Sequence, residues 1–223
     1  MTVLLVLLTF ATFILIDYFV HRHEAAPERT AVREVAPSSS PKEPVWVAGF
    51  ELPDDLHYHP GHTWARLEGD GTVVVGIDAF ASQLLGAPRR LELPTVGAWL
   101  RQGAPSADMA VDGRKAHVVS PVEGEVIAVN RQLEAHPELA QEDPYGRGWL
   151  FKVRSSDLAT SLRNLLSGRL AHRWMEEARE RLDLNLMALS ASVLQDGGAP
   201  VADFARHLTD EDWRRLIHTF LLT

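Results

Sequence analysis

Short runs of β-branched and aromatic residues, separated by Gly or Pro at close intervals, fill the chain from residue 45 to about residue 154. This pattern is typical of strands joined by tight turns. The clearest pair of runs, residues 65–68 and 72–77, flanks Gly69-Asp70-Gly71 and predicts a β-hairpin. Residues 78–85 depart from the pattern and predict a short helix that ends at Gly86. We therefore expect a mainly β domain.

Two segments of this region repeat one arrangement of turn residues. In residues 93–100, and again in residues 120–127, Pro and Gly stand three positions apart ahead of an apolar pair. Pro fixes φ and Gly adopts conformations that other residues avoid, so this spacing lets the chain turn a corner into a strand. Two such corners on either side of residues 111–119 predict a pseudo-symmetric, flattened barrel with a protruding hairpin.

The sequence between the two corners, VDGRKAHVV, indicates two short strands joined at Asp112-Gly113. Asp-Gly strongly favours the central positions of a type I′ turn, which places the apex at these two residues. Lys115 then lies on the returning strand, displaced from the apex. Such a lysine is either an attachment point for a swinging cofactor arm or one more solvated charge.

A series of residues between positions 50 and 157 resembles the H protein of the glycine cleavage system, a relative of lipoyl and biotinyl domains. The order and spacing of the whole series carry the resemblance. The series comprises Tyr58 with His62-Thr63-Trp64, Val75-Gly76-Ile77-Asp78 with Ala81 and Leu85-Gly86, Leu93-Pro94 with Val96-Gly97, Ser120-Pro121-Val122 with Gly124-Glu125-Val126, Asn130 with Leu133, Pro137-Glu138-Leu139, and Asp143-Pro144-Tyr145-Gly146 with Gly148-Trp149-Leu150. It implies a flattened lipoyl/biotinyl-type barrel-sandwich hybrid.

The resemblance also implies a carrier rather than an enzyme. In that family a lysine at a hairpin apex bears lipoate through an amide, and the cofactor supplies the chemistry. Counting back from Ser120-Pro121 without a gap brings the position of the family's lysine onto Gly113 and that of its preceding glutamate onto Ala110. A two-residue deletion after Lys115 would instead align Lys115-Ala116 with the attachment pair.

The predicted turn favours the ungapped alignment, because it puts Asp112-Gly113 at the apex. We therefore expect a non-enzymatic interaction module whose lipoyl-lysine motif is degenerate, with no cofactor favoured. The alternative is an active lipoyl carrier that holds lipoate on Lys115 and moves a covalently bound group between enzymes. No catalytic residue is predicted, since no carboxylate pair is placed for acid–base work and no Gly-x-Ser-x-Gly elbow occurs.

The histidines of the segment HYHPGHTW, His57, His59 and His62, raise the question of a metal site. His-x-His on a strand puts two imidazoles on one face, which is compatible with zinc or copper. However, the resemblance already accounts for His62, and no fourth ligand is evident, although Asp54, Asp55 or Glu68 could approach. We predict no metal, and we expect His117 and His136 to be solvated.

The first residues predict a membrane anchor. Residues 3–20 are apolar except for Asp17, and as a helix they would span roughly 27 Å at 1.5 Å per residue. No Lys or Arg precedes the run, whereas Arg22 and Arg29 follow it, which favours an uncleaved single-pass helix with the main domain facing the cytoplasm. Residues 23–44 are rich in Pro, Ser and mixed charge and predict a linker.

Composition limits the classes of partner that we expect. The net charge of −8 provides no field for polyanions, so nucleic acid is excluded as the expected partner, and the absence of cysteine rules out disulfides and thiolate metal sites. The expected partners are proteins at the membrane and, through residues 3–20, the lipid bilayer.

The chain continues for about 65 residues beyond the region of resemblance. Residues 158–166, a longer segment from residue 169, residues 201–208 and residues 210–222 predict helices, interrupted at residues 195–200 by QDGGAP. The expected apolar stripes are Leu170, Trp174, Ala178, Leu182, Leu186 and Leu189 on the long helix, and Trp213, Leu216, Ile217 and Phe220 on the last. We expect these helices to pack on the barrel, or on a second copy as a homo-oligomer. The predicted organisation is thus an anchor at 1–22, a linker at 23–44, an H-protein-like domain at 45–157 and a helical extension at 158–223.

Overall fold

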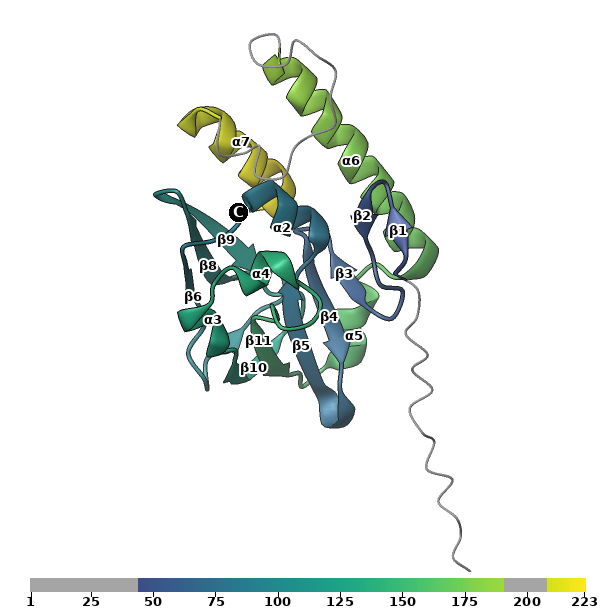
Figure 1. The fold of residues 1–223 in the computed structure, drawn as a ribbon. Coiled ribbons are helices and arrows are strands. Elements are labelled where there is room, and N and C mark those ends of the chain that lie inside the picture. The colour runs from purple at the N-terminus through teal and green to yellow at the C-terminus, as the bar shows by residue number, and fades with distance from the viewer. Residues whose placement is uncertain (1–43, 191–207) are drawn as a thin grey trace, which may run out of the picture. The chain divides into compact units, whose positions relative to one another are not determined.

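The computed structural model describes residues 44–190 and 208–223, all within one compact unit of the chain (Figure 1). The expected anchor and most of the linker, as well as the predicted break at 195–200 and nearly all of the helix predicted at 201–208, lie outside these residues. Within the described part, no helix combines the length and the apolar character needed to cross a bilayer.

The β part of the fold is built from three sheets. The largest has the strand order β3-β4-β5-β11-β10-β7, the second has the order β6-β8-β9, and β1 pairs with β2. All of these pairings are antiparallel. The strands are β1 (Trp46–Val47), β2 (Phe50–Glu51), β3 (His57–His59), β4 (Thr63–Leu67), β5 (Thr72–Ile77), β6 (Arg90–Glu92), β7 (Trp99–Leu100), β8 (Pro105–Val111), β9 (Arg114–Val119), β10 (Gly124–Val129) and β11 (Phe151–Arg154).

Helices cover the sheets and extend the domain. The short ones are α2 (Ala79–Leu85), α3 (Gln132–Ala135), α4 (Leu139–Glu142) and α5 (Leu158–Arg163), with a 3₁₀ turn η1 at Gly69–Gly71. The C-terminal extension supplies the long helix α6 (Gly168–Ser190) and then α7 (Asp210–Leu221). The mainly β prediction with helical C-terminal segments is confirmed.

Local sequence signals account for several of these elements. The predicted hairpin forms from β4 and β5 across η1, where Asp70 and Gly71 both have positive φ. The predicted short helix is α2, whose N-terminus is capped by the Asp78 carboxylate accepting the Ala81 amide and whose C-terminus is at Gly86. Both elements were predicted with ends within two residues of those observed.

The core lies between the two larger sheets and beneath the helices. Its largest fully buried side chains are Trp64, Tyr58, Phe80, Phe151, Leu52, Leu56, Ile77, Leu84, Leu85, Met109, Leu133 and Leu150. On β8 and β9 the buried residues alternate with outward ones, as expected of a sheet with one solvated face. The outer face of this sheet therefore carries the charged residues of the hairpin.

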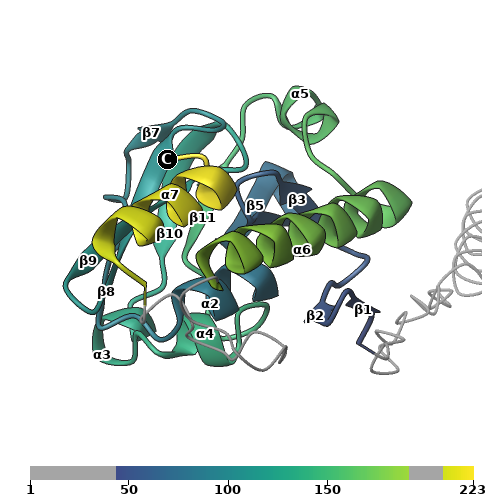
Figure 2. The same cartoon turned by 90° about the horizontal axis from the view of Figure 1, so that it is seen from above.

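The C-terminal helices pack on the strands, which together we call the barrel, as predicted. Trp213, Leu216, Ile217 and Phe220 of α7 are all buried, and α7 lies along β9 and beside α6 (Figure 2). Thr209 caps α7, with its hydroxyl accepting the Asp212 amide. The extension thus belongs to the same hydrophobic core as the barrel.

Two predictions about the extension were wrong in detail. Leu170 is 60% exposed, because the buried stripe of α6 is shifted by one residue near its start and runs through Ala171 and Met175. The helix predicted at 158–166 ends at Arg163, because Leu166 exchanges two backbone hydrogen bonds of 2.8 Å with Tyr58 and cannot continue the helix.

Candidate functional site

The hairpin formed by β8 and β9 has a two-residue apex. Val111 pairs with Arg114, which leaves only Asp112 and Gly113 between the strands. Their φ angles are 47° and 81°, and positive φ at both central residues is the signature of the predicted type I′ turn. A Cβ added at Gly113 would meet nothing within 4 Å, so the apex projects into open space. The apex prediction is confirmed.

Lys115 lies on β9, opposite Ala110, and its side chain is on the outer face of the sheet. Its Nζ is 2.6 Å from Oδ2 of Asp108 on β8 and 3.0 Å from Oε2 of Glu92 on β6. The side chain remains 48% exposed. The ammonium is therefore placed against two carboxylates from neighbouring strands rather than at the tip of the hairpin.

Asp108 joins Lys115 to the imidazole of His117. Its other oxygen, Oδ1, is 2.6 Å from Nδ1 of His117, two residues after Lys115 on the same face of β9. Partial burial acts to raise the pKa of Asp108, but the hydrogen bonds from Lys115 and His117 outweigh it and hold this pKa below its ordinary value. The hydrogen bond to Asp108, with that to Glu92, raises the pKa of Lys115. We call Glu92, Asp108, Lys115 and His117 the outer-face network.

The C-terminal extension holds the other side of the hairpin. The Arg114 guanidinium donates to Oδ1 of Asp210 at 2.8 Å and to the carbonyl of Leu208 at 2.8 Å, and it lies 5.8 Å from the ring centre of Trp213. Arg114 was not singled out from the sequence. Its partners are more than ninety residues away, and no local pattern links them.

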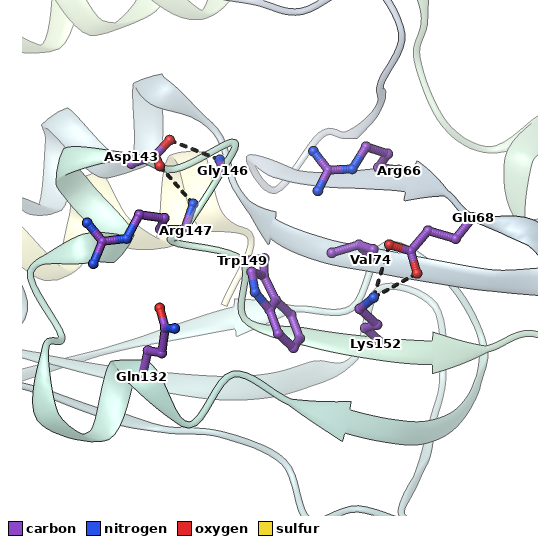
Figure 3. A pocket seen from close by; sticks show the side chains of 9 residues that line it. All are labelled: Arg66, Glu68, Val74, Gln132, Asp143, Gly146, Arg147, Trp149 and Lys152. Atoms are coloured by element: carbon purple, nitrogen blue, oxygen red, sulfur yellow. Dashed lines mark hydrogen bonds and ion pairs between the residues drawn. The ribbon is translucent and has the colours of Figure 1, made fainter. Parts of the chain in front are cut away.

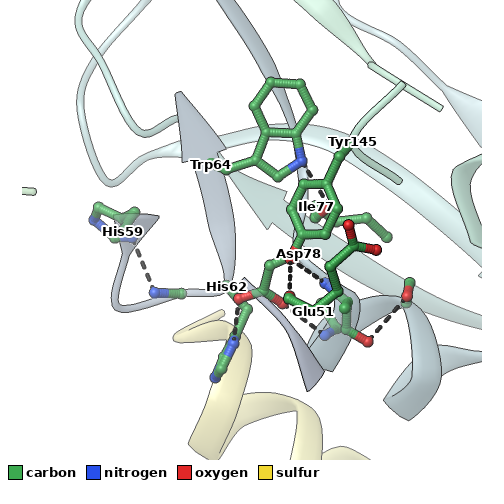
Figure 4. Close-up of polar contacts among 11 residues, drawn as sticks. Glu51, His59, His62, Trp64, Ile77, Asp78 and Tyr145 are labelled. Carbon is green, nitrogen blue, oxygen red and sulfur yellow. Dashed lines mark hydrogen bonds and ion pairs between the residues drawn. The ribbon is translucent and has the colours of Figure 1, made fainter. Parts of the chain in front are cut away.

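The three histidines of HYHPGHTW do not converge on one point. Nδ1 of His62 binds Oδ2 of Asp78 at 2.8 Å, whereas Nδ1 of His59 accepts the Gly61 amide at 3.0 Å (Figure 4). Burial lowers the pKa of both His57 and His59. Over residues 44–190 and 208–223, no three His, Cys, Asp or Glu side chains gather as a metal site would require.

His117 and His136 are exposed, as predicted, although each also contacts a carboxylate. His117 belongs to the outer-face network, and Nδ1 of His136 is 3.1 Å from Glu138. Both contacts lie on the surface, where pairs of side chains add little stability.

Hydrogen bonds of the Tyr145 and Trp64 side chains connect the strands of the barrel to the surrounding loops. The Trp64 indole donates to the carbonyls of Ile77 and Pro144, at 2.8 and 3.1 Å, and the Tyr145 hydroxyl donates to the carbonyl of Glu51 and accepts the Ala79 amide (Figure 4). Burial raises the pKa of the Tyr145 phenol above its ordinary range. These contacts are structural, because every polar atom named has a partner within the protein.

An open pocket of about 460 Å³ lies over β4, β5 and β11 (Figure 3). Both carboxylates that line it are engaged: Glu68 binds Lys152 through both oxygens, and Asp143 accepts the amides of Gly146 and Arg147. Trp149 lies beneath Lys152, 5.6 Å from its Nζ. None of residues 111–115 lines this pocket, so it is separate from the hairpin apex.

Comparisons with known proteins point to one family. The sequence model described as "Glycine cleavage H-protein" matches residues 56–178. The chain is similar to the "Glycine cleavage system H protein" of Chromobacterium violaceum, at 45% identity over 108 residues, which are 48% of this chain and 84% of that protein. It is similar to the protein of the same description from Pseudoalteromonas atlantica, at 44% identity over 106 residues, which are 48% of this chain and 82% of that protein. Its fold is similar to the crystal structure of a glycine cleavage system H protein from Mycobacterium marinum, with a TM-score of 0.50 and 27% identity, covering 57% of this chain and 98% of that one.

Proposed function

The chain belongs to the glycine cleavage H-protein family, a family of lipoyl carriers without catalytic activity, and from this premise we propose that its folded domain is a protein-binding module that carries no lipoate. The observation that carries the proposal is the Asp112-Gly113 apex, which presents no lysine where the family holds its cofactor arm.

The surroundings of Lys115 support the same proposal. A lysine forms an amide only as the neutral amine, and the contacts with Asp108 and Glu92 favour the ammonium. The Lys115 side chain also lies against the sheet. A lipoyl group attached to it would therefore extend from the face of the hairpin rather than from its tip. Both features oppose attachment at this position.

One observation favours the alternative, an active carrier with lipoate on Lys115. About half of the Lys115 side chain is exposed, and only Arg114 separates it from the turn. A ligase that displaced the two carboxylates could therefore reach Nζ.

Intact-mass measurement decides between the two functions. The full chain is expressed together with a lipoate ligase, and the H protein of Chromobacterium violaceum is expressed in the same cells to show that the ligase is active. We expect the full chain to keep its unmodified mass. A lipoyl mass increment that disappears in Lys115→Ala would establish the carrier function instead.

We propose further that residues 3–20 anchor this module in a membrane, with the folded domain on the cytoplasmic side. The apolar run with its basic residues only on the C-terminal side supports this orientation. Fusion of a reporter to the C-terminus tests it. We expect activity from a reporter that works only in the cytoplasm, and export of the reporter across the membrane would contradict the orientation.

A further inference from the structure

A cavity of about 220 Å³ lies between α6, α7 and the turn that precedes β4, away from the hairpin apex. That volume corresponds to roughly seven water molecules at liquid density. His62 and Pro60 line it from the barrel, while the other lining residues come from the two C-terminal helices and from Leu222, which follows α7. Residues of α7 and Arg181 lie beyond the region matched by the family, so the cavity is a product of this chain's extension.

The innermost polar group is the imidazole of His62. His62 is 1% exposed, and its partner Asp78 is 0% exposed. The backbone at His62 is left-handed, with φ of 59°, a conformation that costs free energy for a residue other than glycine. The Asp78 amide donates to the carbonyl of His62, so backbone and side chain together fix the ring. Residues other than glycine that are held in this conformation cluster at ligand-binding sites.

The hydrogen bonds of the His62 imidazole determine which of its nitrogens can donate to a ligand and which can accept from it. Nδ1 is 2.8 Å from Oδ2 of Asp78, and the other oxygen of Asp78 accepts the Ala81 amide at 2.8 Å. A carboxylate only accepts, so Nδ1 carries the hydrogen, and in the neutral ring Nε2 is an acceptor. Among the described residues Nε2 has no hydrogen-bond partner, and it lies on the side of the ring away from Asp78, toward α7 (Figure 4). The neutral imidazole therefore presents one oriented acceptor to the cavity.

Aromatic rings surround this acceptor. The His62 ring stacks on Phe80, with centroids 4.1 Å apart, and the rings of Trp174 and Phe220 are 4.6 and 6.1 Å from it. Trp174 and Phe220 also line the cavity. Flat apolar walls of this kind favour a ring-shaped ligand.

Charged residues stand at the outer end of the cavity. Glu177 and Arg181 are one turn apart on α6, both exposed, and no ion pair joins them to each other or to another described residue. The hydroxyl of Thr219 donates to the Arg215 carbonyl, so its oxygen can only accept from a ligand. A ligand that fills the cavity would thus place an apolar ring inside and a charged tail between Glu177 and Arg181.

We propose that this cavity binds a small phenol with a charged tail, the chemical class of tyrosine and tyramine. The phenolic hydroxyl donates to Nε2 of His62, the ring lies against Trp174 and Phe220, and the tail meets Glu177 through an ammonium or Arg181 through a carboxylate. This site is independent of the lipoyl question, because it uses no residue of the hairpin.

Matched compounds test the proposal on the full-length chain. Tyramine and phenethylamine differ only in the hydroxyl group, and binding is measured by titration calorimetry, with ligand-observed saturation-transfer NMR as a second readout and detergent alone as the blank. We expect phenethylamine to bind about tenfold more weakly, the effect of one lost hydrogen bond to the imidazole. Equal affinities for the two compounds, or no binding of either at several millimolar, would overturn the proposal.

Replacement of the buried His62 could unfold the domain. The variants therefore change Glu177 and Arg181, the two exposed charged residues that line the cavity. Glu177→Gln should weaken tyramine but not 4-hydroxyphenylpropionate, whose tail is a carboxylate. Arg181→Gln should do the reverse. If both variants left both affinities unchanged, the tail would not lie where the proposal puts it, and the proposal would fail.

Discussion

Asp108 is the residue that most determines the state of Lys115. It contacts Lys115 and His117 through different oxygens, at 2.6 Å each, and so stands between two potential cations on the outer face of the hairpin. Asp108 lies directly opposite His117 in the register that the Asp112-Gly113 turn sets, and it reaches Lys115 diagonally across the two strands. The charge state of the one candidate attachment residue therefore depends on the opposite strand.

Replacing Asp108 should make Lys115 more reactive. In Asp108→Asn the carboxylate that most strongly raises the Lys115 pKa is lost, so more neutral amine is present at pH 8. We expect acylation of Lys115 by an N-hydroxysuccinimide ester to be faster in the variant than in the parent protein, because the neutral amine is the nucleophile. Lys152, held by Glu68, is the internal control in the same mass spectra. An unchanged ratio of the two labelling rates would show that Asp108 does not control Lys115.

The coupling between Asp108 and Lys115 should also depend on pH in a defined way. The depressed pKa of Asp108 contributes stability that is present above the ordinary value of 3.8 and is lost as pH falls through the lower folded value. The raised pKa of Lys115 contributes stability that is present below 10.5 and is lost as pH rises through the higher folded value. A double-mutant cycle of Asp108→Asn and Lys115→Met, in a His117→Gln background, should give a coupling that is constant between these limits and fades beyond both. A coupling that changed between pH 5 and 9 would contradict this account.

At the scale of elements, the β4–β5 hairpin depends on one close approach. Gly76 pairs with Trp64, and a Cβ at Gly76 would lie 2.5 Å from the Trp64 ring, which is fully buried and donates to two carbonyls. The indole has no free space in which to move. The glycine is therefore required by packing rather than by the turn.

Gly76→Ala should destabilise the domain by about 1–3 kcal/mol, the usual cost of overpacking a core. Gly69→Ala is the matched control in the same hairpin, since a Cβ there meets nothing within 4 Å, and it should stay within about 0.5 kcal/mol of the parent. Denaturant unfolding of both variants measures the difference. Equal stabilities would mean that Trp64 can shift without cost.

Elements with strong local signals could be predicted from the sequence, whereas contacts between distant segments could not. Gly69-Asp70-Gly71, Asp78 with Gly86, and Asp112-Gly113 define turns and caps through the preferences of a few adjacent residues, and each appears as predicted. The end of α5 was missed because Leu166 pairs with Tyr58, more than a hundred residues earlier in the chain. The contact of Arg114 with Asp210 and the cavity that His62 shares with α7 depend on the packing of α7, which no local pattern encodes.

At the scale of the whole molecule, the C-terminal extension and the barrel share one hydrophobic core, so a substitution where they meet should lower the stability of the whole domain. Trp213 is buried at the junction, between the core and the Arg114 guanidinium. Trp213→Ala should cost about 3–5 kcal/mol, and Leu170→Ala, at an exposed position of α6, should cost less than about 0.5 kcal/mol.

Limited proteolysis of the full chain reports the same junction. Small and polar residues such as those of the Gln195–Pro200 sequence, QDGGAP, are preferred cleavage sites, so we expect early cuts in the extension to be confined there, with both resulting helices still held on the barrel. In Trp213→Ala, α7 should detach from the barrel, and the protease should then shorten the chain further, toward Asp157. In Leu170→Ala the cleavage pattern should be that of the parent protein. Rapid trimming of the parent protein itself to about Asp157 would show that the extension does not stay docked without a partner, and that its packing on the barrel contributes little free energy.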